Sequence, residues 1–308
     1  MYQGFPRNGG NTSSLVGADQ PRPNLEGLHF TLYIFPFSLY SIMVRFTISL
    51  GSHYQEGAQG LPRITHKLVN LHQDENLEEW YLTTVNPEGQ VPVMFAQRDG
   101  QPDIAKTPGS LDISKFLCMA YFPGMTPDEH RATIEDSLDK IHAIVDLSLT
   151  IKDPGEDDKV EIRNQKLEEL LARNDISASY RPALEYKQAY YKQTLAYALR
   201  PENVAKAKCQ ADELFEQLLV IYEEHNGPSS DKIVQWLFGP SIGPTILDAH
   251  ATAFIARLDD AGQEDMVPPT LLSYTRGKVV LPASNAVCHD RKTLWRPDYG
   301  HVHMLVDI

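Results

Sequence analysis

The stretch that decides the fold runs from residue 28 to residue 51 and reads LHFTLYIFPFSLYSIMVRFTISLG. Its first part, residues 28–37, is rich in Phe, Tyr, Ile and Leu, which suits a buried β-strand. Pro36, several serines and Arg45 interrupt the apolar run, and a charge at the centre of a bilayer is costly. We therefore interpret the stretch as part of the core of a soluble protein rather than as a membrane span.

The second part of this stretch is ambiguous. Between Tyr40 and Leu50 the apolar residues alternate with period two, at Ile42, Val44, Phe46, Ile48 and Leu50. On pattern alone the alternation favours a second strand, and the β-branched residues support that interpretation. A helix at this place follows only from the family resemblance described below.

The composition describes a globular chain with room for two domains. The sequence has 308 residues, of which 42% are apolar and 9% are aromatic, so it can bury a substantial core. Its formal net charge is −13, which argues against a dedicated nucleic-acid binder and against a basic protein on a membrane surface. We therefore expect neither nucleic acid nor a membrane among its partners.

The cysteines and the first residues of the chain indicate a cellular compartment. Cys118, Cys209 and Cys288 are odd in number and widely spaced, so they define neither a disulfide framework nor a zinc site. Residues 1–26 hold many Gly, Pro, Asn and Ser and lack the apolar core of a signal peptide. These features predict a cytoplasmic protein without a metal centre.

Turn formers and apolar periodicity divide the chain into four parts. Residues 1–26 are expected to form a flexible tail, 27–123 a mixed domain, 124–279 an all-helical domain and 280–308 an irregular tail. The mixed domain should contain four strands, and the sequence defines the residue ranges of three of them. The expected strands are 28–37, 63–71 and 91–96, and the expected helices are 76–85, 110–121, 134–145, 160–173, 182–199, 204–223, 246–258 and 270–276, with a solvated turn at 152–158.

Four stretches carry a resemblance to a known family. They are residues 28–51, VNPEGQVPVM at 85–94, GPTILDAHATAFIARL at 243–258 and, more weakly, GSLDISKFL at 109–117. Their order and spacing resemble the cytosolic glutathione S-transferases, particularly fungal members, and the Val-Pro stretch and the Thr-x-x-Asp helix are fairly specific as a pair. The resemblance implies a thioredoxin-like α/β N-terminal domain followed by an all-α helical C-terminal domain, with a helix over residues 40–50.

The resemblance also implies how glutathione would bind. In the family the proline of the Val-Pro pair is cis, and a cis bond turns the backbone of the preceding residue outward. Val91 would then pair its N–H and C=O with the cysteinyl unit of glutathione, as a strand is added to a sheet edge. From the sequence alone, a trans proline that starts a strand is the alternative. The expected binding residues for this cosubstrate are Gln90, Val91, Pro92 and Ser110.

Ser110 precedes a predicted helix, where a hydroxyl and a backbone N–H would hold the γ-glutamyl group of glutathione. A simple N-cap serine is the alternative. The family usually has an acidic residue just before this serine, whereas Pro108 and Gly109 stand there in this sequence. The amino group of glutathione would then lack its usual carboxylate, unless Asp103 or a residue of a partner subunit supplies one.

The hydroxyl that activates the glutathione sulfur is expected shortly before Val44. Counting back six residues, as the resemblance to serine-type members implies, gives Ser38. Tyr40 and Ser41 are close alternatives, and a turn serine without a catalytic role is the other interpretation of Ser38. The count for tyrosine-type members reaches Ile34, which is no tyrosine, and the three cysteines lie far from this position.

Two other motifs indicate different chemistry. Residues 239–243 match the G-x-S-x-G pattern of serine hydrolases, but only helical patterns precede them and Pro244 follows at once. His301 and His303 suggest a metal site, but no further ligands stand at recognisable spacing. We therefore favour neither a hydrolase nor a metalloprotein.

Thr245 and Asp248 predict a structural feature instead. A threonine followed three residues later by an acid is the pattern of a capping box at the start of a helix. We assign this pair to folding rather than to catalysis.

Together these features predict a glutathione S-transferase-like enzyme. Glutathione would bind in the first domain, and its thiolate would attack an electrophilic carbon of a small apolar substrate held by the helical domain. The resemblance to fungal members implies a tailoring step in secondary metabolism, either a conjugation or a glutathione-dependent double-bond isomerisation, and it implies a homodimer. A non-catalytic binding or regulatory module of the same fold is the alternative.

Overall fold

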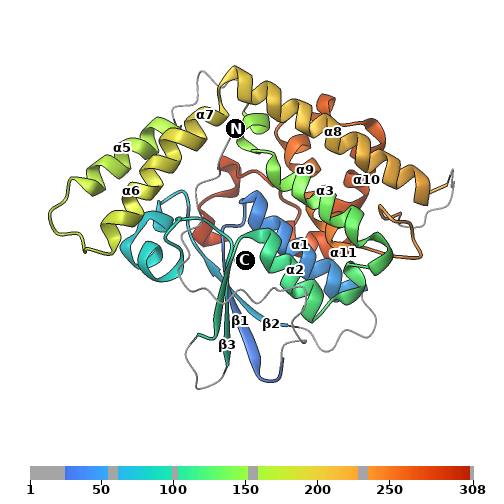
Figure 1. The fold of residues 1–308 in the computed structure, drawn as a ribbon, viewed down its shortest axis with the longest axis horizontal. Coiled ribbons are helices and arrows are strands. Elements are labelled where there is room, and N and C mark those ends of the chain that lie inside the picture. Colours follow the sequence, from blue (N-terminus) through green and yellow to red (C-terminus); the bar gives the residue numbers. More distant parts are fainter. Residues whose placement is uncertain (1–24, 55–61, 99–102, 152–158, 228–234, 306–308) are drawn as a thin grey trace.

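The computed structural model describes residues 25–54, 62–98, 103–151, 159–227 and 235–305 (Figure 1). The tail predicted at 1–26 lies almost wholly outside these residues, and so does the turn predicted at 152–158. Figure 1 shows a small sheet at one end of the molecule and helices over the rest of it. Within the described residues, no helix is both long enough and apolar enough to cross a membrane.

A four-stranded sheet forms the N-terminal half, with the strand order β2-β1-β3-β4. Its strands are β1 Leu28–Ile34, β2 Arg63–Leu68, β3 Val93–Arg98 and β4 Ala105–Pro108. β1 runs parallel to β2 and antiparallel to β3, so Phe30 pairs with Ile64 on one side and with Ala96 on the other. β3 and β4 are antiparallel. This mixed sheet has the thioredoxin-like arrangement that the resemblance implies.

The central strand β1 separates two apolar clusters. Phe30, Leu32 and Ile34 are fully buried in the main core, which the helices on one face of the sheet share. Tyr33 and Phe35 contribute to a second cluster that includes Val91. The two sets follow from the period of two that a strand imposes on its side chains.

The ambiguous segment after β1 is a helix, α1 Leu39–Tyr54. Eleven of its 16 residues are buried, so apolar residues occur on nearly every side and the helical period disappears from the sequence. Gly51 lies where a Cβ atom would overlap the ring of Phe122, which shows how closely the helix is packed. The implication of the resemblance is therefore confirmed, and the strand that the alternation favoured is wrong.

The helix predicted over 76–85 is divided in two. A short 3-10 turn covers Glu75–Leu77, and a single π-helical turn covers Tyr81–Val85. Glu78 separates them, because its ψ of 149° is extended and cannot continue a helix. α2 Ser110–Ala120 then follows β4 and packs beside α1.

The second half of the chain is helical, as predicted. Its helices are α3 Arg131–Ala143, α4 Leu147–Thr150, α5 Lys159–Leu171, α6 Tyr180–Tyr190, α7 Ala196–Ala198, α8 Pro201–His225, α9 Ile246–Asp260 and α10 Pro269–Val279. A π-helical turn, Tyr191–Leu195, lies between α6 and α7 inside the helix predicted over 182–199. Figure 1 shows α5 and α6 side by side, and α6 packs on the turn Tyr81–Val85 of the N-terminal half.

The central helix of this half, α9, begins with the predicted capping box. Thr245 accepts a hydrogen bond from the backbone N–H of Asp248, and the Asp248 carboxylate accepts one from the backbone N–H of Thr245 at 2.8 Å. The other carboxylate oxygen accepts from the N–H of Leu237 at 2.9 Å and from the hydroxyl of Tyr274 at 2.5 Å. Asp248 is fully buried, so these bonds make the capping box a structural feature of the core.

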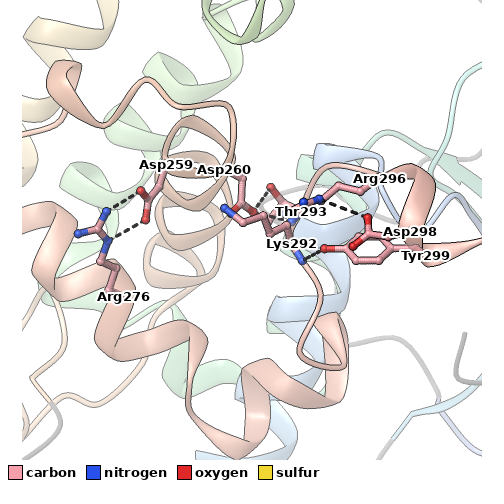
Figure 2. A network of polar contacts seen from close by, with 8 residues as sticks. All are labelled: Asp259, Asp260, Arg276, Lys292, Thr293, Arg296, Asp298 and Tyr299. Atoms are coloured by element: carbon pink, nitrogen blue, oxygen red, sulfur yellow. Dashed lines mark hydrogen bonds and ion pairs between the residues drawn. The ribbon is translucent and has the colours of Figure 1, made fainter.

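The sequence predicted an irregular tail over 280–308, whereas the described part of this segment is ordered against the core. α11 Pro282–Cys288 packs on α1, with Pro282 in the first turn, where a missing N–H leaves no bond unmade. Asp260 then accepts hydrogen bonds from the backbone and the hydroxyl of Thr293, at 2.6 and 2.8 Å. Figure 2 shows these contacts beside the Arg276–Asp259 ion pair.

Beyond Thr293 the chain returns to the N-terminal half. Tyr299 stacks on Phe37, with ring centroids 5.8 Å apart and an angle of 14° between the planes. Val302 is buried in the second apolar cluster, beside Phe35 and Val91. These contacts join residues more than 200 positions apart in the sequence, which explains why no local pattern predicted them.

Candidate active site

The loop that precedes β3 contains the cis peptide bond that the resemblance implies, between Val91 and Pro92. Pro92 itself is joined to the start of α2, because its carbonyl oxygen accepts a hydrogen bond from the N–H of Gly109 at 3.1 Å. The loop and the helix that carry the predicted binding residues are thereby adjacent.

A lysine from the helical half holds the beginning of this loop. The Lys187 ammonium, on α6, donates to the carbonyl oxygens of Glu88 at 2.7 Å and of Gly89 at 2.9 Å. The Asn76 amide donates to the same Gly89 oxygen at 2.9 Å. Gly89 has a φ of 60°, and a Cβ there would lie 3.0 Å from the Asn76 carbonyl oxygen, so the turn requires glycine.

The predicted binding residue Gln90 is held by its carbonyl oxygen rather than by its side chain. The Tyr81 hydroxyl donates to this oxygen at 2.7 Å and the Asn86 amide donates at 2.9 Å. By contrast, the backbone N–H and C=O of Val91 take part in none of the hydrogen bonds found in the described part of the chain. The loop is therefore fixed by side chains up to the one residue whose backbone remains open.

Ser110 is the first residue of α2 and is 4% exposed. The position before it, where the sequence lacks the family's acid, is Gly109 with a φ of 86°. A Cβ at Gly109 would meet no atom within 4 Å, so there is open space where an acidic side chain would stand. Asp103 lies apart from this space in contact with β3, because its carboxylate accepts a hydrogen bond from Gln97 at 2.7 Å.

Ser38 directly precedes α1 and caps it. Its Oγ accepts a hydrogen bond from the N–H of Ser41 at 3.4 Å, and its own N–H donates to Phe35 at 2.9 Å. The side chain is half-buried, and within the described residues no acceptor takes the hydrogen of its hydroxyl. Ser38 therefore offers a fixed oxygen and a free O–H donor at the positive end of a 16-residue helix.

The two alternative hydroxyls point elsewhere. Ser41 is fully buried, and its Oγ accepts a hydrogen bond from the N–H of Phe35 at 3.3 Å. The Tyr40 hydroxyl donates to the Asp146 carboxylate at 3.5 Å, in the turn between α3 and α4. Burial, followed by the charge of Asp146, raises the pKa of Tyr40 well above its ordinary value. Neither oxygen shares the position of Ser38 at the start of α1.

An arginine from α9 fixes the residue before Ser38. Arg257 is 6% exposed, and its Nη2 donates to the carbonyl oxygens of Phe37 at 2.7 Å and of Thr293 at 2.9 Å. Burial lowers the pKa of Arg257, and the charge of Asp146 is the largest of the opposing effects. The helical half and the C-terminal segment thus both contact the loop that carries Ser38.

Sequence reasoning missed Lys187, Arg257 and Asp146. Lys187 had a visible signal, because it interrupts an apolar stripe of helical spacing formed with Leu184 and Tyr191. Arg257 stood within a quoted family motif without a role assigned to it. Asp146 had no local signal.

Two observations concern the motifs that indicate different chemistry. Residues 235–238, the described residues directly before the pattern at 239–243, form no strand, so they do not supply the strand that a hydrolase elbow needs. No three of the described His, Cys, Asp and Glu residues form a group that could hold a metal ion. A hollow of about 370 Å³ near Ser148, Val204 and Gly262 includes none of the residues described above.

Comparisons with known proteins give structural relatives alone. No family model matches the sequence, and no curated protein matches it either. Among solved structures, the beta-etherase LigF from Sphingobium has a TM-score of 0.56 and 17% identity, over 84% of this chain and 98% of its own. Maleylacetoacetate isomerase from Anaeromyxobacter dehalogenans, solved with dicarboxyethyl glutathione and citrate in the active site, has a TM-score of 0.50 and 15% identity, over 89% of this chain and 97% of its own.

These likenesses establish the fold class. The chain shares the fold of these two proteins, a thioredoxin-like N-terminal half followed by a helical C-terminal half. At such low sequence identity the likeness concerns the fold, so the activity must be argued from the site.

Proposed function

We propose that the protein is a glutathione-dependent transferase that activates the glutathione thiol for attack on a small apolar electrophile. One observation carries the proposal. The loop before β3 is fixed by side chains through Gln90 and leaves the backbone of Val91 open, while Ser38 has a free hydroxyl hydrogen at the start of α1. An open backbone pair and a hydroxyl donor are what a cysteinyl unit and its sulfur require.

Each residue has a role in this proposal. The N–H and C=O of Val91 pair with the cysteinyl unit, as the resemblance implies for the residue before the cis proline. Ser110 and the first N–H groups of α2 bind the γ-glutamyl carboxylate. The Ser38 hydroxyl donates to the sulfur, and the positive end of α1 adds to the stabilisation of the thiolate.

The reaction follows from a stabilised thiolate. The thiol releases its proton to solvent, and a sulfur electron pair forms a bond to the electrophilic carbon. In a conjugation the leaving group departs with its bonding electrons. In a double-bond isomerisation the sulfur adds, the carbon skeleton rotates and the thiolate leaves again, so glutathione is regenerated.

The first test is a titration of bound glutathione in the Ser38→Ala variant. One hydrogen bond to a charged group contributes roughly 1.5–3 kcal/mol, and 1.36 kcal/mol corresponds to one pKa unit. We expect the thiol pKa to rise by about one to two units, read from thiolate absorbance, while the dissociation constant for glutathione barely changes. If Tyr40→Phe or Ser41→Ala shifts the titration and Ser38→Ala does not, the assignment of Ser38 is wrong.

A non-catalytic binding module is the second candidate, and Gly109 is the observation that favours it. The acid that family members usually have before the serine is absent, which would weaken the hold on the glutathione amino group. A protein that binds glutathione without any fall in the thiol pKa would support this module. Absence of binding at millimolar glutathione, by calorimetry and by thermal shift, would exclude both candidates.

We also propose a homodimer in the cytoplasm that modifies a secondary metabolite. The resemblance to fungal members supports the dimer and the metabolic role, and the acidic composition supports the location. Light scattering that gives a mass near the 34.7 kDa of one chain would contradict the dimer. A metabolite profile unchanged by deletion of the gene would contradict the metabolic role.

A further inference from the structure

Four side chains near the start of α1 form what we call the tyrosine–aspartate cluster: Tyr40, Asp146, Tyr186 and Tyr190. They come from three places in the fold, namely α1, the turn before α4 and the second half of α6. All four are half-buried, so each keeps part of its surface accessible to solvent. Tyr186 and Tyr190 are one helical turn apart and therefore lie on the same face of α6.

Contacts of its ring and of its hydroxyl fix the position of Tyr40 in this cluster. Its ring stacks on His142, with centroids 6.0 Å apart and planes at 26°, while its hydroxyl donates to Asp146. His142 in turn shares a hydrogen bond of 3.0 Å with His250, and His250 shares one of 3.0 Å with Ser114 in the core. The ring thus rests on a chain of polar contacts that reaches into the centre of the molecule.

The two tyrosines of α6 are not fixed by their hydroxyls. Within the described part of the chain, neither the Tyr186 nor the Tyr190 hydroxyl has a hydrogen-bond partner. Burial, followed by the charge of Asp146, raises the pKa of Tyr190 to about 12. Burial and then the charge of Glu88 raise the pKa of Tyr186. The cluster therefore extends from Asp146 towards the loop proposed to bind glutathione.

Asp146 is the acid of the cluster, and Arg257 carries the opposite charge near it. Burial raises the pKa of Asp146, whereas the charge of Arg257 lowers it. Both Arg257 and Lys187 already donate hydrogen bonds to backbone oxygens. Arg257 donates to Phe37 and Thr293, and Lys187, which lies 5.1 Å from the Tyr190 ring centre, donates to Glu88 and Gly89. An incoming anion would thus meet an acid without a cation ready to receive it, whereas a hydroxyl donor would meet an acceptor.

From this arrangement we infer that the electrophile is an uncharged aromatic molecule with a hydrogen-bond donor group. Its ring packs against Tyr186 and Tyr190, its donor group binds the Asp146 carboxyl, and Asp146 rejects anionic electrophiles. Aromatic pairs and a carboxyl acceptor give the attraction, and the like charge of Asp146 in direct contact gives the discrimination. The inference rests on the proposed function, because it takes the electrophile to lie beside glutathione.

Three glutathione conjugates that differ at one position test the inference. S-benzylglutathione, S-(4-hydroxybenzyl)glutathione and S-(4-carboxybenzyl)glutathione present hydrogen, a hydroxyl and a carboxylate in the same place. By calorimetry on the unaltered protein at pH 7.5, we expect the hydroxyl compound to bind at least threefold more tightly than the parent. We expect the carboxylate to bind about tenfold more weakly than the parent.

Variants then assign the discrimination to Asp146. In Asp146→Asn the carboxylate conjugate should gain most of the lost affinity, since the amide has a similar shape and no charge. The control is Asp139→Asn, an exposed acid on α3, which should leave the ranking unchanged. Tyr40→Phe keeps the Asp146 carboxylate and should also keep the ranking.

The outcomes separate this inference from the proposed function. If glutathione and all three conjugates fail to bind, the proposed function is wrong. If glutathione binds but the carboxylate conjugate binds as tightly as the parent, the inference is wrong and the proposed function stands. Because the ranking is measured on the unaltered protein, the result does not depend on whether any variant folds.

Discussion

The loop proposed for glutathione and the cluster proposed for the electrophile satisfy their polar groups in opposite ways. In the loop, the carbonyl oxygens of Glu88, Gly89 and Gln90 each accept one or two side-chain hydrogen bonds. In the cluster, the hydroxyls of Tyr186 and Tyr190 have no partner among the described residues. The first surface is fixed before any ligand arrives, and the second can still form bonds.

This difference matches what each surface would have to recognise. Glutathione is one molecule with a peptide backbone, so a rigid loop with one open N–H and C=O can bind it with little loss of entropy. An electrophile is recognised by its shape and its polar groups, which side chains can match. Changes that loosen the loop or occupy the cluster should therefore affect different ligands.

The largest expected effect is a loss of stability in acid. It arises at His142 and His250, the histidines on which the Tyr40 side of the cluster rests. Burial is the main cause that lowers the pKa of His142 to about 4 and the pKa of His250 well below its ordinary value. Lys115 lowers both further, and Asp139 opposes the shift of His142. The unfolded chain therefore takes up these protons first, so the stabilisation is complete above about pH 6.5 and is lost as the pH falls towards 4.

Urea unfolding between pH 7 and pH 4.5 measures this loss. Each histidine that is protonated only in the unfolded chain contributes a slope of up to about 1.4 kcal/mol per pH unit. The His142→Gln variant should have a shallower slope. His66 on β2, whose pKa burial lowers to about 4, contributes in the same range, so His66→Gln should reduce the slope without affecting the cluster. An unchanged slope in both variants would contradict the prediction.

The next effect concerns Lys187, which joins the two regions. Lys187→Met keeps the length of the side chain but leaves the Glu88 oxygen without its side-chain donor. Since hydrogen bonds to charged groups contribute about 1.5–3 kcal/mol, we expect the unfolding free energy to fall by about that amount. We expect glutathione to bind about tenfold more weakly as well, because the loop before Val91 loosens.

Lys192→Met is the matched control for Lys187. Lys192 lies five residues further along and pairs with Glu168 at 3.2 Å, with side chains 50% and 55% exposed. An exposed pair of this kind contributes about 0–1 kcal/mol, so this variant should bind glutathione normally. Equal weakening in both variants would show that the effect comes from the loss of a positive charge rather than from the bonds to the loop.

A smaller effect is expected for Tyr81→Phe. The variant removes one of the two donors to the Gln90 oxygen and leaves the Asn86 amide in place. A neutral hydrogen bond contributes about 0.5–1.5 kcal/mol, which corresponds to a two- to tenfold loss of glutathione affinity. Calorimetry with glutathione measures this loss, and the three benzyl conjugates should keep their ranking. A changed ranking would mean that the loop and the cluster are not independent.

The sequence could predict the features that repeat locally or that belong to a motif. The four-strand half, the helical half, the capping box at Thr245 and the cis bond at Pro92 all follow from period, spacing or resemblance. α1 could not be read from its period, because burial on almost every side removes the polar face that would reveal a helix. Resemblance succeeded there because it compares order and spacing instead of polarity.

The parts that the sequence could not predict depend on contacts between distant segments. Thr293 bonds to Arg257 and Asp260, which lie 36 and 33 residues earlier, so the segment from 280 onward appeared irregular in the sequence. Asp146 is recognisable as a candidate residue only by its hydrogen bond with Tyr40, 106 residues away in sequence. Such residues have ordinary neighbours in sequence and become distinctive only when the tertiary structure brings a partner.

The smallest effect on the unfolding free energy should come from Tyr190→Phe. Tyr180, a second tyrosine of α6, provides the comparison. Tyr180 is 3% exposed, and its hydroxyl donates to the carbonyl oxygen of Leu77 at 2.5 Å, whereas the Tyr190 hydroxyl has no partner among the described residues. Both variants lose one oxygen atom from the same helix. Tyr180→Phe leaves a buried carbonyl unsatisfied and should lower the unfolding free energy by about 1–3 kcal/mol, whereas Tyr190→Phe should change it by less than about 0.5 kcal/mol. Urea unfolding of the two variants side by side measures this difference.

The result decides whether the Tyr190 hydroxyl is available to a ligand. If Tyr190→Phe lowers the unfolding free energy as much as Tyr180→Phe, the Tyr190 hydroxyl already has a hydrogen-bond partner in the free protein, and the polar groups of the cluster are satisfied like those of the loop. If Tyr190→Phe leaves the unfolding free energy unchanged but alters the ranking of the three conjugates, the Tyr190 hydroxyl forms its hydrogen bond with the ligand.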